Sequence, residues 1–159
     1  MAKKEQHVKK VGGPFLAAAV FCTSVSEDSD GVLSAIRIID EFRIALPSGT
    51  PTDFPSKSKP LEINIFALIV IRRGDARAGK HKLRLVGEQP DGTIQELVAE
   101  DIEMPPFPNG TTGVRAKINM KLHSEGVRWI DVILGKERLT RMALNLVIHR
   151  ADATTEKPT

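Results

Sequence analysis

The stretch GKHKLRLVGEQPDGT, residues 79–93, alternates apolar and polar side chains and then breaks at Pro-Asp-Gly. Successive side chains of an extended chain point to opposite sides, so Leu83 and Leu85 share one side with His81. The opposite side is basic and carries Lys80, Lys82 and Arg84. Gly92 can adopt the positive φ that a tight turn requires. The stretch therefore predicts a half-buried strand with a solvated basic face, followed by a turn.

Similar segments recur along the chain, separated by proline and glycine. We expect strands at 15–25, 61–73, 79–88 and 93–104, and three more within 114–148, the last two joined by a two-residue turn at Gly135 and Lys136. Residues 47–60 contain four prolines and no periodicity, which indicates a long loop, either functional or mobile. The spacing of the segments is typical of a β-sandwich.

Residues 31–46, GVLSAIRIIDEFRIAL, fit either a strand or a helix. As a strand they would turn one apolar face to the core, made of Val32, Ile36, Ile38, Phe42 and Ile44. As a helix they would make the protein a small α+β domain. We favour the strand, and we predict an all-β fold: an antiparallel two-sheet β-sandwich of about eight strands, immunoglobulin-like in the loose sense.

The most apolar segment, LEINIFALIVIRR at residues 61–73, has apolar side chains at every second position from Leu61 to Ile71. Phe66, Leu68 and Val70 add a second apolar face in its later half. We therefore expect that half to be buried on both sides.

Length and charge define the domain organisation. A chain of 159 residues suits one domain, and we predict a flexible basic arm at 1–13, a sandwich domain at 14–150 and a disordered polar tail at 151–159. The arm carries four lysines and one glutamate, which equals the formal net charge of +3 of the whole chain. The folded body is thus balanced in charge, which argues against a nucleic-acid partner.

The N-terminal run FLAAAVFC, residues 15–22, imitates a signal peptide but continues without a small-residue cleavage site, so a first buried strand is the preferred interpretation. No apolar run approaches the ~18 residues of a membrane helix. We expect a cytoplasmic protein with no membrane partner.

The sequence offers no catalytic or cofactor signature. The motifs G-x-S-x-G, H-E-x-x-H, G-x-G-x-x-G and the P-loop are absent, so we predict no enzyme, no catalytic residue and no cofactor. Cys22 is the only cysteine and is expected to be an inert buried thiol. His81 is expected to be a strand histidine bonded to backbone, and the scattered histidines predict no metal site. With no tyrosine and one tryptophan, a sugar site is also not expected.

Two groups of residues are candidates for binding. The first is basic and comprises Arg72, Arg73, Arg77, Lys80 and Lys82. This basic group could lie at one end of the sandwich and bind phosphate or an acidic partner. Alternatively, it could be a solvated sheet edge on which lysines discourage aggregation.

The second group is Trp129 with Ile133, which share the outward side of one predicted strand. They would form an exposed apolar strip suited to a partner or a second subunit. The alternative is that Trp129 packs under the proline-rich loop.

The order of the predicted strands and two sequence motifs resemble those of an uncharacterised family of small bacterial β-sandwich proteins of unknown function. The matching positions are Gly79, His81, Leu83, Leu85, Asp91 and Gly92, and then Gly126, Asp131, Val132, Leu134, Leu139, Arg141, Leu144 and Val147. The resemblance covers residues 15–148 and implies the sandwich fold, but no activity.

These features favour a non-catalytic binding or assembly module that acts through protein–protein contacts, with a protein partner or with a second copy of itself. The alternative is a small-ligand or anion-binding domain that uses the basic loop at 72–84. A hydrolase with dispersed catalytic residues ranks third.

Overall fold

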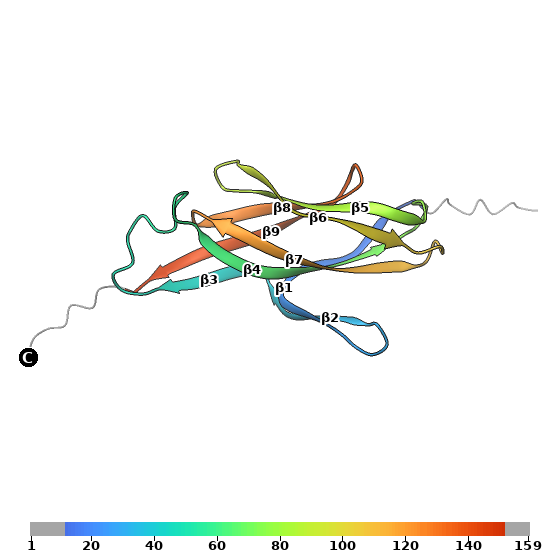
Figure 1. The fold of residues 1–159 in the computed structure, drawn as a ribbon, viewed down its shortest axis with the longest axis horizontal. Helices are drawn as coiled ribbons and strands as arrows, with labels where there is room; N and C mark the ends of the chain where they lie inside the picture. Colours follow the sequence, from blue (N-terminus) through green and yellow to red (C-terminus); the bar gives the residue numbers. More distant parts are fainter. Residues whose placement is uncertain (1–11, 152–159) are drawn as a thin grey trace, which may run out of the picture.

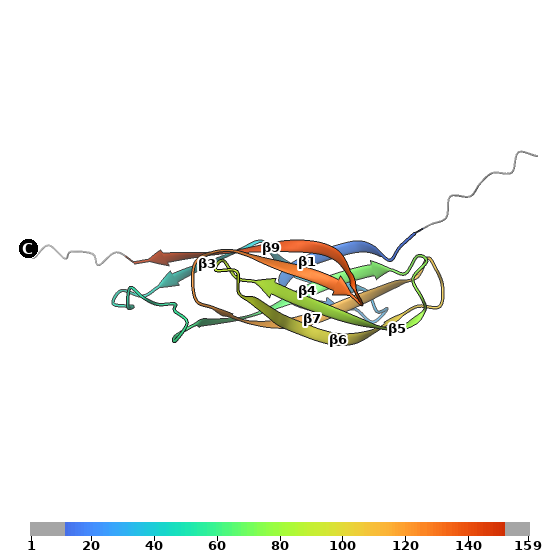
Figure 2. The same cartoon turned by 90° about the horizontal axis from the view of Figure 1, so that it is seen from above.

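The computed structural model describes residues 12–151, which form two β-sheets packed face to face (Figure 1). The strands are β1 (Phe15–Glu27), β2 (Leu33–Ile39), β3 (Glu41–Leu46), β4 (Leu61–Arg72), β5 (Gly79–Glu88), β6 (Ile94–Met104), β7 (Thr111–Leu122), β8 (Gly126–Leu134) and β9 (Glu137–Arg150). One sheet has the order β2-β1-β4-β7 and the other β3-β9-β8-β5-β6. The strands run along the length of the molecule in both layers (Figure 2).

The predicted all-β sandwich is confirmed, with nine strands in the described residues where about eight were expected. It is not wholly antiparallel, because β3 pairs with β9 in parallel. Apart from residues 12, 13 and 151, the predicted arm and tail lie outside the described residues.

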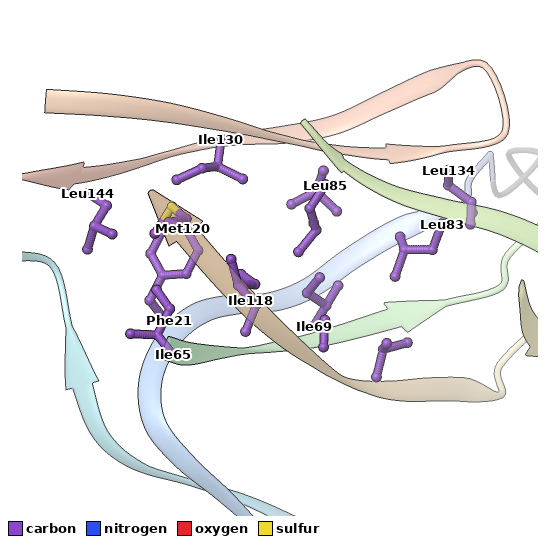
Figure 3. Packing of buried hydrophobic residues seen from close by; sticks show 14 of the residues in the cluster. Phe21, Ile65, Ile69, Leu83, Leu85, Ile118, Met120, Ile130, Leu134 and Leu144 are labelled. Atoms are coloured by element: carbon purple, nitrogen blue, oxygen red, sulfur yellow. The ribbon is translucent and has the colours of Figure 1, made fainter. Parts of the chain in front are cut away.

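The core lies between the sheets and is made by the alternate residues of each strand (Figure 3). In β4 the inward side chains of Ile65 and Ile69 are fully buried, and in β5 those of Leu83 and Leu85 are too. Strand β8 pairs with β5 and aligns its own inward residue Val132 with Leu85. The alternation seen in residues 79–93 therefore does place one face of a strand in the core and the other in solvent.

The segment 31–46 forms two strands that belong to different sheets. Strand β2 pairs with β1 in the four-stranded sheet, and after Asp40 the chain crosses over so that β3 runs beside β9 in the five-stranded sheet. Neither a single strand nor a helix is therefore correct. Both strands lie at an edge of their sheets, so a single residue between them is enough for the change of layer.

The apolar face predicted for this segment is correct only in its second half. In β3, Phe42 and Ile44 pack against the core, whereas Val32, Ile36 and Ile38 are exposed, the last of them at 66%. The reason is that β1 stops pairing with β4 at Cys22 and continues with β2 as a hairpin that projects from the sandwich (Figure 1). The hairpin buries its opposite face instead.

This hairpin forms a second, smaller apolar cluster on the outer face of β4. Cys22 and Val25 from β1 pack with Leu68 of β4, and five partly buried residues surround them: Val20, Leu33, Ala35, Phe66 and Val70. The predicted burial of β4 on both sides is confirmed. Cys22 is buried as expected, and burial raises the pKa of its thiol.

The proline-rich segment 47–60 contains no strand or helix and is held by backbone turns and by a side chain from β9. The Arg150 guanidinium donates hydrogen bonds to the carbonyl oxygens of Pro51 at 3.1 Å and Thr52 at 3.2 Å. This loop therefore packs at the end of the sandwich where β9 finishes.

Candidate functional site

The outward face of the five-stranded sheet carries an exposed tryptophan. Trp129 lies on β8 between two inward-facing residues, so its ring points away from the core and is 42% exposed. Its cross-strand neighbours are Glu88 on β5 and Ala143 on β9. Val127 on the same strand and Ile94 on β6, which pairs with Glu88, are also exposed. We call these residues, together with Arg141, the Trp129 face.

Arg141 fixes the centre of this face. Its guanidinium carbon lies 5.8 Å from the centroid of the Trp129 ring, a cation–π distance. Its Nε donates to Asp131 Oδ1 at 2.8 Å, and one Nη donates to Glu88 Oε2 at 2.9 Å. The hydrogen bond from Arg141 lowers the pKa of Asp131. The stacked pair thus presents a flat apolar ring and an oriented cation to the surroundings.

The predicted strip of Trp129 and Ile133 is interrupted. Asp131 and its partner Arg141 lie between the two residues, and Ile133 is half-buried opposite Arg84. Trp129 is not covered by the proline-rich loop, since two fifths of its surface is open. Of the two apolar residues proposed from sequence, Trp129 is therefore the one that a partner can reach.

The five basic residues predicted to act together lie in three different places. Arg72 is on the outer side of the four-stranded sheet, where it pairs with Thr111. Lys80 and Lys82 lie on the outer face of the other sheet, and Lys82 forms an ion pair with Asp101 at 3.5 Å. Arg73 is used structurally, because its guanidinium donates to the carbonyl oxygens of Ala76 at 2.7 Å and Pro106 at 2.6 Å.

Arg77 lines a groove. This groove has a volume of about 550 Å³ and lies between the β4–β5 loop and the β8–β9 turn. Its lining residues are Pro14, Ala76, Arg77, His81, Leu134, Gly135, Lys136 and Glu137. We call it the Arg77 groove. Sequence reasoning missed the meeting of Arg77 with Lys136, because the two residues are far apart along the chain.

His81 behaves as expected for a strand histidine. Its Nε2 lies 2.6 Å from the carbonyl oxygen of Arg77. A carbonyl oxygen can only accept, so Nε2 carries the proton and donates it. The bond joins β5 to the loop that precedes it and fixes the ring beside the groove.

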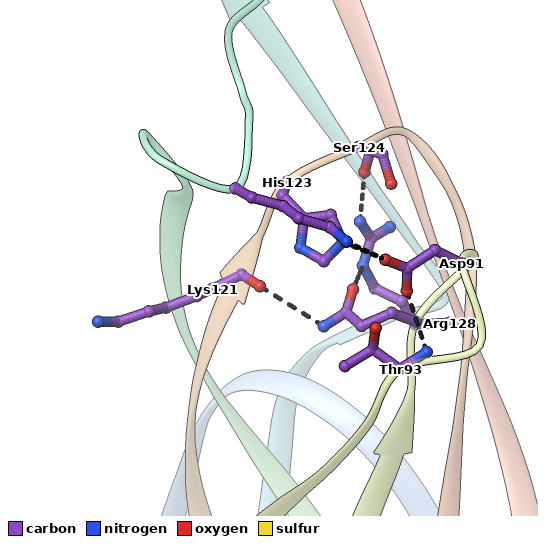
Figure 4. A network of polar contacts seen from close by, with 8 residues as sticks. Asp91, Thr93, Lys121, His123, Ser124 and Arg128 are labelled. Atoms are coloured by element: carbon purple, nitrogen blue, oxygen red, sulfur yellow. Dashed lines mark hydrogen bonds and ion pairs between the residues drawn. The ribbon is translucent and has the colours of Figure 1, made fainter.

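The opposite end of the sandwich holds a buried arginine that the sequence did not predict (Figure 4). Arg128 points inward from β8 and is 1% exposed. Its Nε donates to Gln89 Oε1 at 3.1 Å and one Nη donates to the Gly126 carbonyl at 2.8 Å, while the other Nη donates to the Ser124 carbonyl. Burial lowers the pKa of Arg128. The guanidinium joins the β5–β6 and β7–β8 turns.

Asp91 lies at the surface of the same end of the sandwich, where its carboxylate binds groups from neighbouring segments. The backbone amide of Thr93 donates to its carboxylate at 3.0 Å, and the Nζ of Lys57 and the Nε2 of His123 lie 3.2 and 3.3 Å away. The bonds from Thr93, followed by that from Lys57, hold the pKa of Asp91 well below its usual range. Lys57 belongs to the proline-rich loop, so the ionised carboxylate links three loops.

Acidification should therefore weaken the fold through Asp91. A carboxylate whose pKa is lowered by folding stabilises the native state above its unfolded pKa of about 3.9, and that contribution is lost as the pH falls below this value. We expect chemical denaturation between pH 6 and pH 3 to show a smaller loss of stability for Asp91→Asn than for the wild type. Asp28→Asn is the control, since Asp28 is also a turn aspartate but the hydrogen bonds it makes with residues 12–151 are those of its backbone. Equal pH dependence of Asp91→Asn and the wild type would contradict this role.

The described residues contain no group of three or more His, Cys, Asp or Glu side chains placed to hold a metal ion. His123 and Ser124 lie side by side in the β7–β8 turn, but the contacts they make are with Asp91 and Arg128, in the manner of a turn. No helix within residues 12–151 has the length and apolar character needed to cross a membrane.

The two packed sheets define the class of protein: a β-sandwich with nine strands within residues 12–151. No family model matches the chain, and no curated protein matches it either. Among solved structures, it is similar to the Pseudomonas fluorescens alkylpurine DNA glycosylase AlkC bound to DNA containing an abasic site analogue, with a TM-score of 0.40, 12% identity and 65% of this chain covered. The chain spans 27% of the length of that glycosylase.

It is also similar to an immunoglobulin-like protein from Pseudomonas aeruginosa, with a TM-score of 0.33 and 14% identity over 87% of this chain and 95% of the other. At such low identity and TM-score, neither similarity bears on what this protein binds.

Proposed function

We propose that this protein is a non-catalytic binding or assembly module that contacts another protein, or a second copy of itself, through the Trp129 face. The observation that carries the proposal is the exposed Trp129 ring, stacked against Arg141 in the middle of a sheet. Tryptophan and arginine are the residues most enriched among those that dominate binding energy at protein interfaces.

The surroundings of Trp129 support this assignment. Val127 adds apolar surface on the same strand as Trp129, and Ile94, which is 61% exposed, adds more on the far side of Glu88. Polar groups border it: Arg141 forms ion pairs with Glu88 at 2.9 Å and Asp131 at 2.8 Å, and Glu96, two residues from Ile94, lies 3.8 Å from Arg84. An apolar centre with a charged rim is the usual anatomy of a protein interface. The Arg141 side chain is already held by hydrogen bonds to Asp131 and Glu88, so binding requires little further ordering of it.

The proposal also includes a cellular location and a family. We assign the module to the cytoplasm, where a lone buried cysteine such as Cys22 needs no oxidising compartment. We also assign the chain to the family of small bacterial β-sandwich proteins that it resembles. In that resemblance Asp131 and Arg141 match, and these are the residues that orient the Trp129 ring.

Replacing Trp129 with alanine should strongly weaken the contact and leave the fold intact. A central tryptophan contributes about 2 kcal/mol or more to binding, which corresponds to an affinity loss of about 30-fold. Sedimentation velocity over a concentration series measures self-association, and affinity capture from the source cell, quantified against the variant, measures a heterologous partner. Phe107→Ser is the matched control, because Phe107 is an exposed aromatic residue in the β6–β7 loop.

The proposal requires Trp129→Ala to lose an association that the wild type and Phe107→Ser both retain. If the three proteins sediment alike at all concentrations and capture the same proteins in equal amounts, the Trp129 face is not the contact surface.

A further inference from the structure

We propose that the Arg77 groove binds a small organic anion with an apolar body, such as a medium-chain carboxylate. This inference is independent of the Trp129 face, which lies toward the other end of β8. It rests on three features of the groove: two cations with no ionic partner among residues 12–151, a histidine held in place, and apolar lining residues.

The cations come from opposite sides of the groove. Arg77 is contributed by the β4–β5 loop and Lys136 by the two-residue turn between β8 and β9. Among residues 12–151, no carboxylate lies within 4.0 Å of the charged nitrogens of either residue. Glu137 is the one acidic residue of the lining, so the cations are in excess. An anion placed between Arg77 and Lys136 would find two charge-assisted donors.

The framework that carries these cations is well anchored. The bond from His81 Nε2 to the Arg77 carbonyl fixes the loop at its end, and the bonds from Arg73 tie the same loop to Ala76 and to the β6–β7 loop. On the other side, the amide of Gly135 donates to the carbonyl of Lys82 at 2.8 Å. The groove is therefore formed before any ligand arrives, which lowers the entropic cost of binding.

The backbone around Arg77 also depends on a glycine. Gly74 has a φ of +57°, and a Cβ there would lie 2.5 Å from the carbonyl oxygen of Gly12. Only glycine allows this close approach of the N-terminal segment, which brings Pro14 to the groove.

The apolar lining residues decide the class of ligand. Pro14, Ala76 and Leu134 line the same groove as the two cations. A volume of about 550 Å³ falls within the ~300–1,000 Å³ usual for small-molecule sites. Inorganic phosphate would use the cations and leave the apolar residues unused, whereas an alkyl carboxylate uses both. The apolar lining of the groove and its positive charge together thus favour an anion that carries an alkyl chain over an anion without one.

The experiment is a titration of the full-length protein with three probes: octanoate, acetate and octylamine. Octanoate combines the negative charge with an apolar body, acetate keeps only the charge, and octylamine carries the same alkyl chain on a cation. Calorimetry gives the affinities, and amide chemical shifts give the location. We expect octanoate to bind at least about tenfold more tightly than acetate, since each buried methylene adds to affinity. We expect no binding of octylamine, and shifts confined to residues 74–81 and 134–137.

Two double variants test the cations. Arg77→Gln with Lys136→Gln should weaken octanoate binding by about tenfold or more, because two charge-assisted bonds are lost. Arg72→Gln with Lys80→Gln removes the same charge from residues that do not line the groove, and it should change the affinity less than twofold. All four substitutions are at the surface, so the melting temperature should stay near that of the wild type.

Three results would overturn the proposal: no binding of octanoate at millimolar concentration, equal binding of octylamine, or equal weakening in the two double variants. The first would show that the groove takes no such ligand, the second that the alkyl chain alone binds, and the third that only net charge matters. None of these outcomes depends on Trp129, so the two proposals fail separately.

Discussion

Arg128→Ala is expected to destabilise the protein by about 3–5 kcal/mol, enough to bring a domain of ordinary stability close to unfolding. The side chain is buried and donates to three acceptors in two turns: Gln89, Gly126 and Ser124. Its removal leaves those acceptors without their donor and opens a cavity beneath the β7–β8 turn. Chemical denaturation at neutral pH measures the change.

Two opposing effects act at Arg128. Burying a guanidinium away from water is costly, and the lowered pKa of Arg128 reflects that cost. In the folded state the three hydrogen bonds offset it, and hydrogen bonds to charged groups are worth about 1.5–3 kcal/mol each. Since the alanine variant removes the bonds and keeps the buried acceptors, the loss of hydrogen bonding outweighs the relief of desolvation.

A double-mutant cycle with Gln89→Leu isolates this interaction. Gln89 is itself buried, and its amide donates weakly to the Lys121 carbonyl at 3.5 Å. Arg128→Ala combined with Gln89→Leu should cost less than the sum of the single changes, because the leucine no longer presents an unsatisfied acceptor. Arg128→Lys should also be destabilising, since an ammonium cannot reproduce the planar fork of donors. A cost below about 1 kcal/mol for Arg128→Ala would show that the network does not hold the turns.

Ile69→Ala should be the second most damaging substitution. Ile69 is fully buried between the sheets, and replacing a buried isoleucine by alanine typically costs about 2–5 kcal/mol through lost apolar contact and a cavity. The matched control is Ile38→Ala, the same change at a residue that is 66% exposed on β2. It should alter the stability by less than about 0.5 kcal/mol. The midpoints of urea denaturation report both values.

This pair also tests the split of residues 31–46. A single strand with the predicted apolar face would have buried Ile38, and the two alanine variants would then be similarly destabilised. The projecting β1–β2 hairpin predicts the large difference instead. Comparable losses for Ile69→Ala and Ile38→Ala would mean that β2 is packed on both of its faces.

The candidate surfaces show how far side-chain alternation can be used to predict function. The alternation of apolar and polar side chains correctly predicted that Trp129 lies on the outward side of its strand. It also correctly predicted that Lys80 and Lys82 lie on the solvated side of β5. The five basic residues of the first candidate group were predicted to act together because they are close along the chain. The structure separates them, because β4 and β5 belong to different sheets and Arg73 turns back to bind the β6–β7 loop.

The sequence by itself determined most of the strands, and in β4, β5 and β8 it also determined the side that faces the core. Alternation in β4, β5 and β8, and the glycines at the turns, are local features, since they depend only on which side of an extended chain each residue occupies. Only the tertiary structure decided which other residues pack against each face of a strand. Asp40 divides a continuous apolar run between two sheets, and the β1–β2 hairpin leaves Ile36 and Ile38 exposed.

The burial of Arg128 and the meeting of Arg77 with Lys136 were likewise decided by the packing of distant turns. An arginine in a strand is expected at the surface, and nothing near Arg128 in the chain indicates that two turns will close over it. Contacts between residues that are far apart in sequence depend on how whole sheets pack, and the alternation of side chains along one strand carries no information about that packing.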